Sequence, residues 1–152
     1  MSKQDFTTSF PVDKTPKEVF EAINNVRGWW TEGVEGDTEK LGDEFSVQFW
    51  EVHYSKQRLI EVVPYSKIVW LVTESKLTFV EDQSEWTGHQ IVFDITPKGT
   101  QTEVRFTQIG LVPQGECYND CSNAWRGYIN NSLKNLISTG KGNPTTKEEL
   151  SK

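Results

Sequence analysis

The sequence lacks the long apolar runs that insertion into a membrane requires. No stretch of the 152 residues approaches the roughly 20 apolar residues of a membrane-spanning helix. The first five residues are polar and differ from the apolar segment of a secretory signal peptide. We therefore expect a cytoplasmic protein with no membrane span.

Cysteine is scarce, since only Cys117 and Cys121 occur. Two cysteines are too few for the disulfide framework of a small secreted domain. Their four-residue spacing is compatible with two metal ligands on one face of a helix. Zinc sites, however, normally use four ligands and short Cys-x-x-Cys pairs. We expect no metal and no cofactor, and two reduced cysteines with Cys121 packed in the core.

Positive charge is also in short supply. The chain has 16 Lys and Arg residues against 22 Asp and Glu residues, which gives a net charge of -6 and a pI near 5.0. Binding to nucleic acid depends on basic side chains that neutralise phosphates. Anionic membrane surfaces attract basic segments in the same way. We therefore expect neither nucleic acid nor an anionic membrane surface as a partner.

Large aromatic residues are plentiful, with 6 Trp, 8 Phe and 4 Tyr. Each buries much apolar area, so a few of them can build a sizeable core. The length suits one domain, which needs no disulfide or metal to fold. We expect this domain to cover residues 1–140. The polar segment 141–152 has no periodic pattern and is expected to be a disordered tail.

Six strands are predicted, four from alternating apolar and polar residues, one from β-branched residues at 58–63 and one from the run at 67–73 that is apolar on both faces. The first strand covers residues 6–12. Thr15, Pro16 and Glu18 follow it and are typical of a helix start: Thr15 supplies the cap, Pro16 lies in the first turn, and Glu18 completes the capping box. A second short helix is expected between residues 24 and 30. Further strands are predicted at 45–49, 58–63, 67–73, 91–95 and 102–108, the last two forming a hairpin.

A long C-terminal helix is predicted by the apolar residues that recur every three or four positions from Cys121 to Ile137. Gly140 is predicted to cap this helix, and Pro144 prevents its continuation. Alternating strands with helices segregated along the chain indicate an α+β fold. Its helices would lie on one face of a six-stranded antiparallel sheet.

Short motifs that match a known superfamily are spread from about residue 5 to residue 142. They include Phe10-Pro11-Val12-Asp13, Glu18-Val19-Phe20, Trp29-Trp30, Gly42-Asp43-Glu44-Phe45, Ile68-Val69-Trp70, Trp86-Thr87-Gly88, Gly99-Thr100 and Ser132-Leu133-Lys134. With them the chain resembles the START-like (SRPBCC) superfamily, which includes the birch-pollen allergen fold. More closely, it resembles the branch of homologues of the activator of the heat-shock-protein-90 ATPase. The resemblance implies a helix-grip fold, a curved sheet wrapped around the C-terminal helix, with two short helices after the first strand.

The resemblance further implies a cavity between sheet and helix, which many relatives use for lipids, hormones or polyketides. We therefore expect non-enzymatic binding of a small hydrophobic or amphipathic ligand. An enclosed volume of roughly 300 Å³ or more would favour such a site. The predicted lining consists of Trp30, Phe49, Trp70, His89, Phe106, Trp125 and Tyr128. The alternative is that these rings simply fill the core.

Two other functions stay open. A protein-interaction module, chaperone-associated or not, would have a filled core and an exposed apolar patch. An enzyme of the cyclase or hydrolase kind would use His89 or Tyr128 for proton transfer and would need a titratable group with a displaced pKa in the cavity. Residues 75–87 form either a lid over the cavity or an irregular hairpin. We expect a monomer or a weak dimer.

Overall fold

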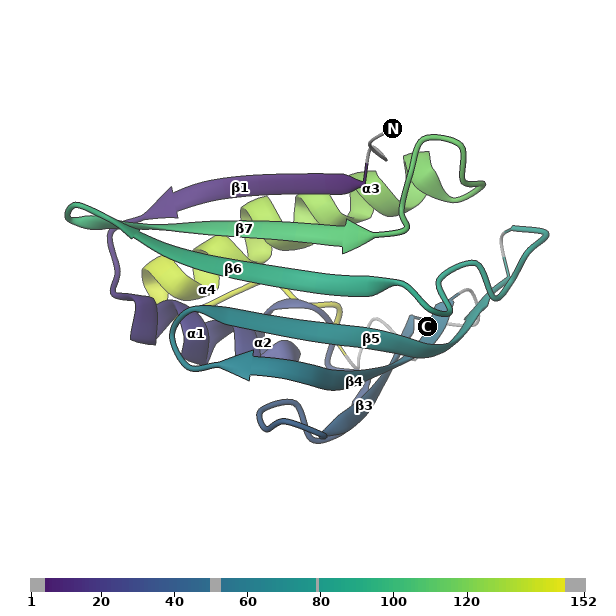
Figure 1. Cartoon of the computed structure of the whole chain (residues 1–152), viewed down its shortest axis with the longest axis horizontal. Helices are drawn as coiled ribbons and strands as arrows, with labels where there is room; N and C mark the ends of the chain where they lie inside the picture. The colour runs from purple at the N-terminus through teal and green to yellow at the C-terminus, as the bar shows by residue number, and fades with distance from the viewer. Residues whose placement is uncertain (1–4, 50–52, 79, 147–152) are drawn as a thin grey trace.

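The computed structural model describes residues 5–49, 53–78 and 80–146, and Figure 1 shows how the elements are arranged. In chain order they are β1 (Phe6–Val12), α1 (Pro16–Asn24), α2 (Val26–Trp29), β2 (Val34–Gly36), β3 (Glu44–Phe49), β4 (His53–Val63), β5 (Lys67–Leu77), β6 (Gln90–Lys98), β7 (Gln101–Ile109), α3 (Tyr118–Gly127), the π-helical segment η1 (Tyr128–Leu133) and α4 (Lys134–Thr139). No helix in the described ranges is long and apolar enough to cross a membrane.

The strands form one curved, unclosed antiparallel sheet in the order β1-β7-β6-β5-β4-β3-β2. The α+β prediction is confirmed, but the described sheet has seven strands rather than six. The additional strand, β2, has only three residues, which is too short for an alternating pattern to be recognised. The start of β4 was also missed because its inward positions Ser55 and Gln57 are polar, and a register shift follows Lys56.

The first helix begins as predicted. The hydroxyl of Thr15 accepts a hydrogen bond from the backbone N–H of Glu18, and the Glu18 carboxylate accepts one from the backbone N–H of Thr15. Pro16 occupies the first turn, where its missing N–H costs no hydrogen bond. The predicted hairpin between β6 and β7 is confirmed as well, with Lys98 opposite Gln101.

The long C-terminal helix is confirmed, and it is continuous through α3, η1 and α4. Its buried stripe follows a spacing of four residues: Cys121, Trp125, Ile129, Leu133 and Ile137. In an α-helix of 3.6 residues per turn, this spacing overshoots one turn by about 40° each time. The wider π-helical turn of η1 reduces that drift. The stripe therefore keeps facing the sheet, and Gly140 ends the helix in the left-handed conformation (φ 85°).

Two expectations from the sequence differ from the structure. Cys117 and Cys121 form a disulfide instead of remaining reduced, because one helical turn brings their Cα atoms to 5.5 Å. The first part of the expected tail, residues 141–146, packs on the domain. Thr145 is buried there and pairs with Thr31 in a parallel bridge. The remainder of that segment, residues 147–152, lies outside the described residues.

Candidate functional site

A pocket of about 190 Å³ lies between the sheet and the start of the long helix. Its walls come from the turn after α2, the end of β3, the start of β4, the loop between β5 and β6, α3 and η1. The lining residues are Trp30, Phe49, His53, Trp86, Asp120, Cys121, Ala124, Trp125 and Tyr128. Asp120 and Ala124 are exposed and mark its opening to solvent, whereas the three Trp side chains are buried.

The aromatic walls pack against one another around this pocket. The ring centroids of Trp30 and Trp125 are 4.8 Å apart, and Trp86 is stacked on Trp125 at 5.8 Å. On the opposite side Phe49 lies 5.8 Å from Tyr128 and 5.2 Å from His53. These ring contacts link the walls of the pocket to one another.

Four of the seven predicted lining residues lie on the pocket wall: Trp30, Phe49, Trp125 and Tyr128. Trp70 and Phe106 face inward as the strand registers predicted, but they belong to the filled part of the core. The Trp70 ring packs edge-on against Phe45 and Phe93, with centroids 4.9 Å away in each case. Phe106 lies beneath Trp125 at 4.5 Å. That the wall residues bind a ligand stays a prediction.

His89 does not line the pocket but is linked to it through Gln108. The Trp125 indole N–H donates a hydrogen bond to Gln108 Oε1 over 2.7 Å, and Gln108 Nε2 lies 2.9 Å from His89 Nδ1. Since Gln108 Nε2 is the donor, His89 accepts at Nδ1 in its neutral form. Burial lowers the pKa of His89, and the nearby Asp5 carboxylate opposes this shift. His89 therefore helps to orient a wall residue.

His53 is a wall residue that the sequence did not indicate. Burial lowers its pKa to about 3, so the ring is neutral at physiological pH. Its Nε2 lies 3.0 Å from Ser55 Oγ, which accepts a hydrogen bond from Gln57 Nε2 over 2.6 Å. The pairing of Phe49 with His53 across the β3–β4 connection places the imidazole at the pocket. The predicted strand at 58–63 began too late to include His53, so the sequence did not place this imidazole at the pocket.

Trp86, the second missed wall residue, comes from the segment that we expected to be a lid or a hairpin. The structure contains parts of both, since Ser75–Leu77 continue β5 and the following loop returns to insert Trp86 under α3. The Trp86 indole N–H donates to Cys117 Sγ over 3.3 Å. The Glu85 carboxylate accepts from the backbone N–H of Cys117. The disulfide-bearing turn and the loop are thus joined at one pocket wall.

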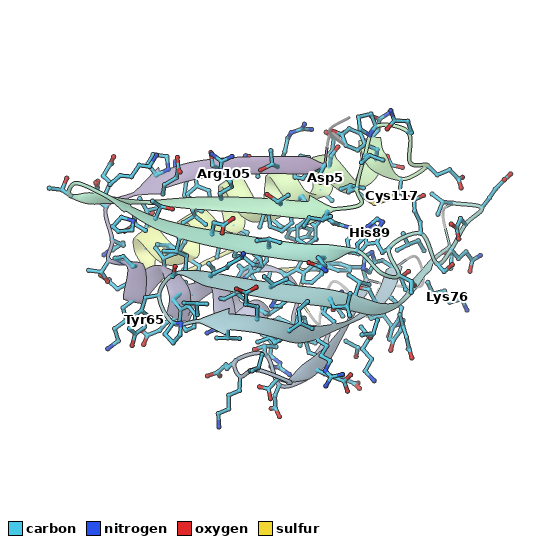
Figure 2. All side chains as sticks on the ribbon, in the orientation of Figure 1. Asp5, Tyr65, Lys76, His89, Arg105 and Cys117 are labelled. Carbon is cyan, nitrogen blue, oxygen red and sulfur yellow. A yellow bond between two sulfur atoms is a disulfide. The ribbon has the colours of Figure 1, made fainter. Side chains whose placement is uncertain are left out.

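The cysteines and histidines lie in separate places among the described residues. Within the part of the chain that the structure describes, no three His, Cys, Asp or Glu side chains are grouped so that they could hold an ion. The two histidines lie in different settings, one on the pocket wall and one beyond Gln108. Figure 2 shows His89 and Cys117 at the same end of the molecule, with Tyr65 at the other end.

The curved antiparallel sheet with a long helix packed against it defines a helix-grip protein. The chain belongs to the family described as "Activator of Hsp90 ATPase homolog 1-like protein", whose profile matches residues 13–138. The predicted START-like resemblance is thereby confirmed. No curated protein matches the chain significantly in sequence.

Solved structures share the fold at low sequence identity. The Aha1 dimer from Colwellia psychrerythraea has a TM-score of 0.74 and 20% identity, over 91% of this chain and 98% of that one. A Staphylococcus saprophyticus protein has a TM-score of 0.69 and 17% identity, over 94% and 98%. DynU16, from the dynemicin biosynthetic locus, has a TM-score of 0.66 and 15% identity, over 93% of this chain and 49% of that one. At such identities the comparison shows the fold alone.

Proposed function

We propose that the protein binds a small hydrophobic or amphipathic molecule, without catalysis, in the pocket between its sheet and α3. The observation that carries this proposal is a hollow with almost entirely apolar walls at one end of an otherwise filled core. Small-molecule sites are commonly built in this way, with a few polar groups that set orientation. His53 and Asp120 are the polar groups available here.

The size of the pocket restricts the ligand to a compact body. Its volume of about 190 Å³ is below the roughly 300 Å³ from which drug-sized sites begin. An apolar cavity of about 150 Å³ accommodates a benzene molecule. A single ring, or an apolar group of that bulk, therefore fits, whereas a long lipid chain or a polyketide does not fit without movement of the walls.

Enzymatic chemistry is the weaker alternative, although His53 is a titratable group in the pocket. A general base works best when its pKa lies near the operating pH. The pKa of His53, lowered to about 3, makes the imidazole a poor proton acceptor at neutral pH. His53 instead serves as a neutral hydrogen-bonding group, and Tyr128 donates or accepts a 2.7 Å hydrogen bond with Thr145.

Filling the pocket from α3 tests the proposal. We take 2-phenylethanol as the probe because its ring matches the volume, and follow binding by amide chemical shifts. Ala124→Leu places a larger side chain at the opening and should abolish the shifts around Trp125. The neighbouring exposed residue Asn123 does not line the pocket, so Asn123→Leu is the matched control and should bind as the parent does. Unchanged binding by Ala124→Leu would exclude this pocket as the site.

A protein-interaction role is the second candidate, and one observation favours it. Tyr65 is 47% exposed, and its φ of 66° is in the left-handed region that non-glycine residues rarely adopt. Val63, in the same turn, is also exposed. Figure 2 shows Tyr65 at the opposite end of the molecule from Cys117, whose disulfide partner Cys121 lines the pocket, so Tyr65→Asn and Ala124→Leu separate the two roles. Only Tyr65→Asn should weaken contact with a protein partner.

A further inference from the structure

We propose that the ligand is an amphipathic cation, with one compact aromatic ring inside the pocket and a protonated amine at its opening. This inference rests on the proposed binding function and adds the chemical class of the ligand. It depends on the charge around the opening, on the aromatic walls and on the direction of the nearest basic side chain.

The charged residue on the pocket wall is an acid. Asp120 lies in the first turn of α3 and is exposed, and among the described residues no lysine or arginine lines the pocket. Two more carboxylates stand next to residues of this region: Glu85 precedes the wall residue Trp86, and Glu116 precedes Cys117, which is bonded to the wall residue Cys121. Glu116 accepts hydrogen bonds from the backbone N–H groups of Glu81 and Asp82, and Glu85 accepts from Cys117. The opening therefore presents negative charge to an incoming ligand.

The basic side chain closest along α3 is turned away. The guanidinium carbon of Arg126 lies 5.2 Å from the centroid of the Phe6 ring, and its Nη1 donates to Asn123 Oδ1. The N-terminal end of α3 would ordinarily favour an anion. Its Cys117 N–H, however, is already occupied by the Glu85 carboxylate. An anionic ligand would thus meet the carboxylates of Asp120 and Glu85 at this end of the helix.

The walls suit an aromatic ring inside the pocket. Trp30, Trp86 and Trp125 are buried, and their indole rings offer apolar and aromatic contacts to a ligand ring. The neutral imidazole of His53 adds no opposing charge within the pocket. A ring buried among these walls and an amine beside Asp120 would use both parts of the site. A neutral ligand of the same size would contact the walls but would gain nothing from the Asp120 carboxylate.

Three probes with a shared phenylethyl body test the inference: 2-phenylethylamine, 2-phenylethanol and 3-phenylpropanoate. Affinities are measured by titration calorimetry on the full chain at pH 7 and low ionic strength. We expect the amine to bind about fivefold more tightly than the alcohol, the effect of one favourable exposed ion pair, and the carboxylate to bind most weakly. High salt should remove the difference between the amine and the alcohol.

Asp120→Asn should reduce affinity for the amine to that for the alcohol, while affinity for the alcohol stays unchanged. Glu21→Gln removes the same charge from an exposed position on α1 and should change nothing. Asp120→Glu, which keeps the charge, should retain the preference and covers any loss of helix stability in the Asn variant. Equal affinities for amine and alcohol would overturn the inference and leave the binding function intact. Failure of all three probes to bind would overturn both.

Discussion

The indole N–H of Trp125 donates a hydrogen bond to Gln108 Oε1 over 2.7 Å, across the interface between α3 and β7. Both side chains are buried, and the Gln108 amide continues to His89 Nδ1. One polar chain therefore fixes the ring that forms the floor of the pocket. A buried N–H that loses its acceptor is costly, so this contact orients Trp125 more strongly than packing alone would.

Gln108→Leu is expected to lower the free energy of unfolding by about 1–3 kcal/mol, because it leaves the Trp125 N–H buried without an acceptor. The measurement is urea unfolding followed by circular dichroism. Trp125→Phe removes the donor, so the double variant should lose less than the sum of the two single variants. Strict additivity would show that the hydrogen bond contributes nothing to the orientation of the ring.

Acidification should destabilise the protein through His53. Its pKa is about 3 in the folded state and about 6.5 when unfolded, so the unfolded chain binds the proton first. The stability contributed by neutral His53 is fully present above pH 6.5 and is lost as the pH falls from about 6.5 to about 3. Between about pH 6 and pH 3, the proton that His53 binds only in the unfolded chain lowers the free energy of unfolding by about 1.4 kcal/mol for each unit of falling pH.

His53→Phe keeps a ring of similar size and removes this titration. The parent should therefore lose stability more steeply than the variant between pH 6 and pH 5, above the range where most carboxylates titrate. His89, whose pKa is lowered by burial, contributes to both proteins alike. Parallel stability curves for the two proteins would mean that His53 has an ordinary pKa in the folded state.

The disulfide provides another prediction. Reduction of Cys117–Cys121 by a dithiol should lower the free energy of unfolding by about 2 kcal/mol, the chain-entropy value for a loop of about five residues. Because Cys117 Sγ accepts from the Trp86 indole, the fluorescence of Trp86 should change as well. The double variant Cys117→Ser/Cys121→Ser should be insensitive to the reductant. Alkylation of two thiols in the untreated protein would contradict the disulfide.

How far the sequence predicts this molecule depends on the range of the interaction concerned. The capping box of Thr15 and Glu18 and the stripe from Cys121 to Ile137 are local patterns, and both predictions are confirmed. The inward direction of Trp70 and Phe106 also follows from local alternation. Whether an inward ring fills the core or borders a hollow depends on its neighbours across the sheet, which alternation does not encode.

The missed wall residues have physical explanations of the same kind. His53 comes from a strand whose inward side chains are polar and whose register shifts, so no period of two was visible. Trp86 is placed by two long-range contacts, a hydrogen bond to Cys117 and stacking on Trp125. The cysteines were predicted to be reduced because two are too few for the disulfide framework of a secreted domain. One helical turn between them nevertheless brings them close enough to bond.

One buried hydroxyl adds to the backbone hydrogen bonds that hold the segment at the C-terminal end, those of Thr145 with Glu32 and Trp30. Ser132 Oγ donates to the Trp29 carbonyl over 2.6 Å and accepts from the Asn143 N–H over 2.7 Å. It thereby joins the long helix to the turn beside the pocket and to the chain after Gly140. A Cβ at Gly142 would lie 2.4 Å from the Gly28 carbonyl oxygen, so only glycine allows this approach.

Ser132→Ala should therefore lower the free energy of unfolding by about 1–3 kcal/mol, since it leaves a buried carbonyl and a backbone N–H without their partner. It should also speed amide hydrogen exchange at Asn143 and Thr145, as the segment detaches before the domain unfolds. Ser138→Ala, at an exposed position of α4, is the matched control and should change stability by less than about 0.5 kcal/mol. Exchange at Thr145 that is equally fast in the parent and in Ser132→Ala would show that residues 141–146 are a loose tail in solution.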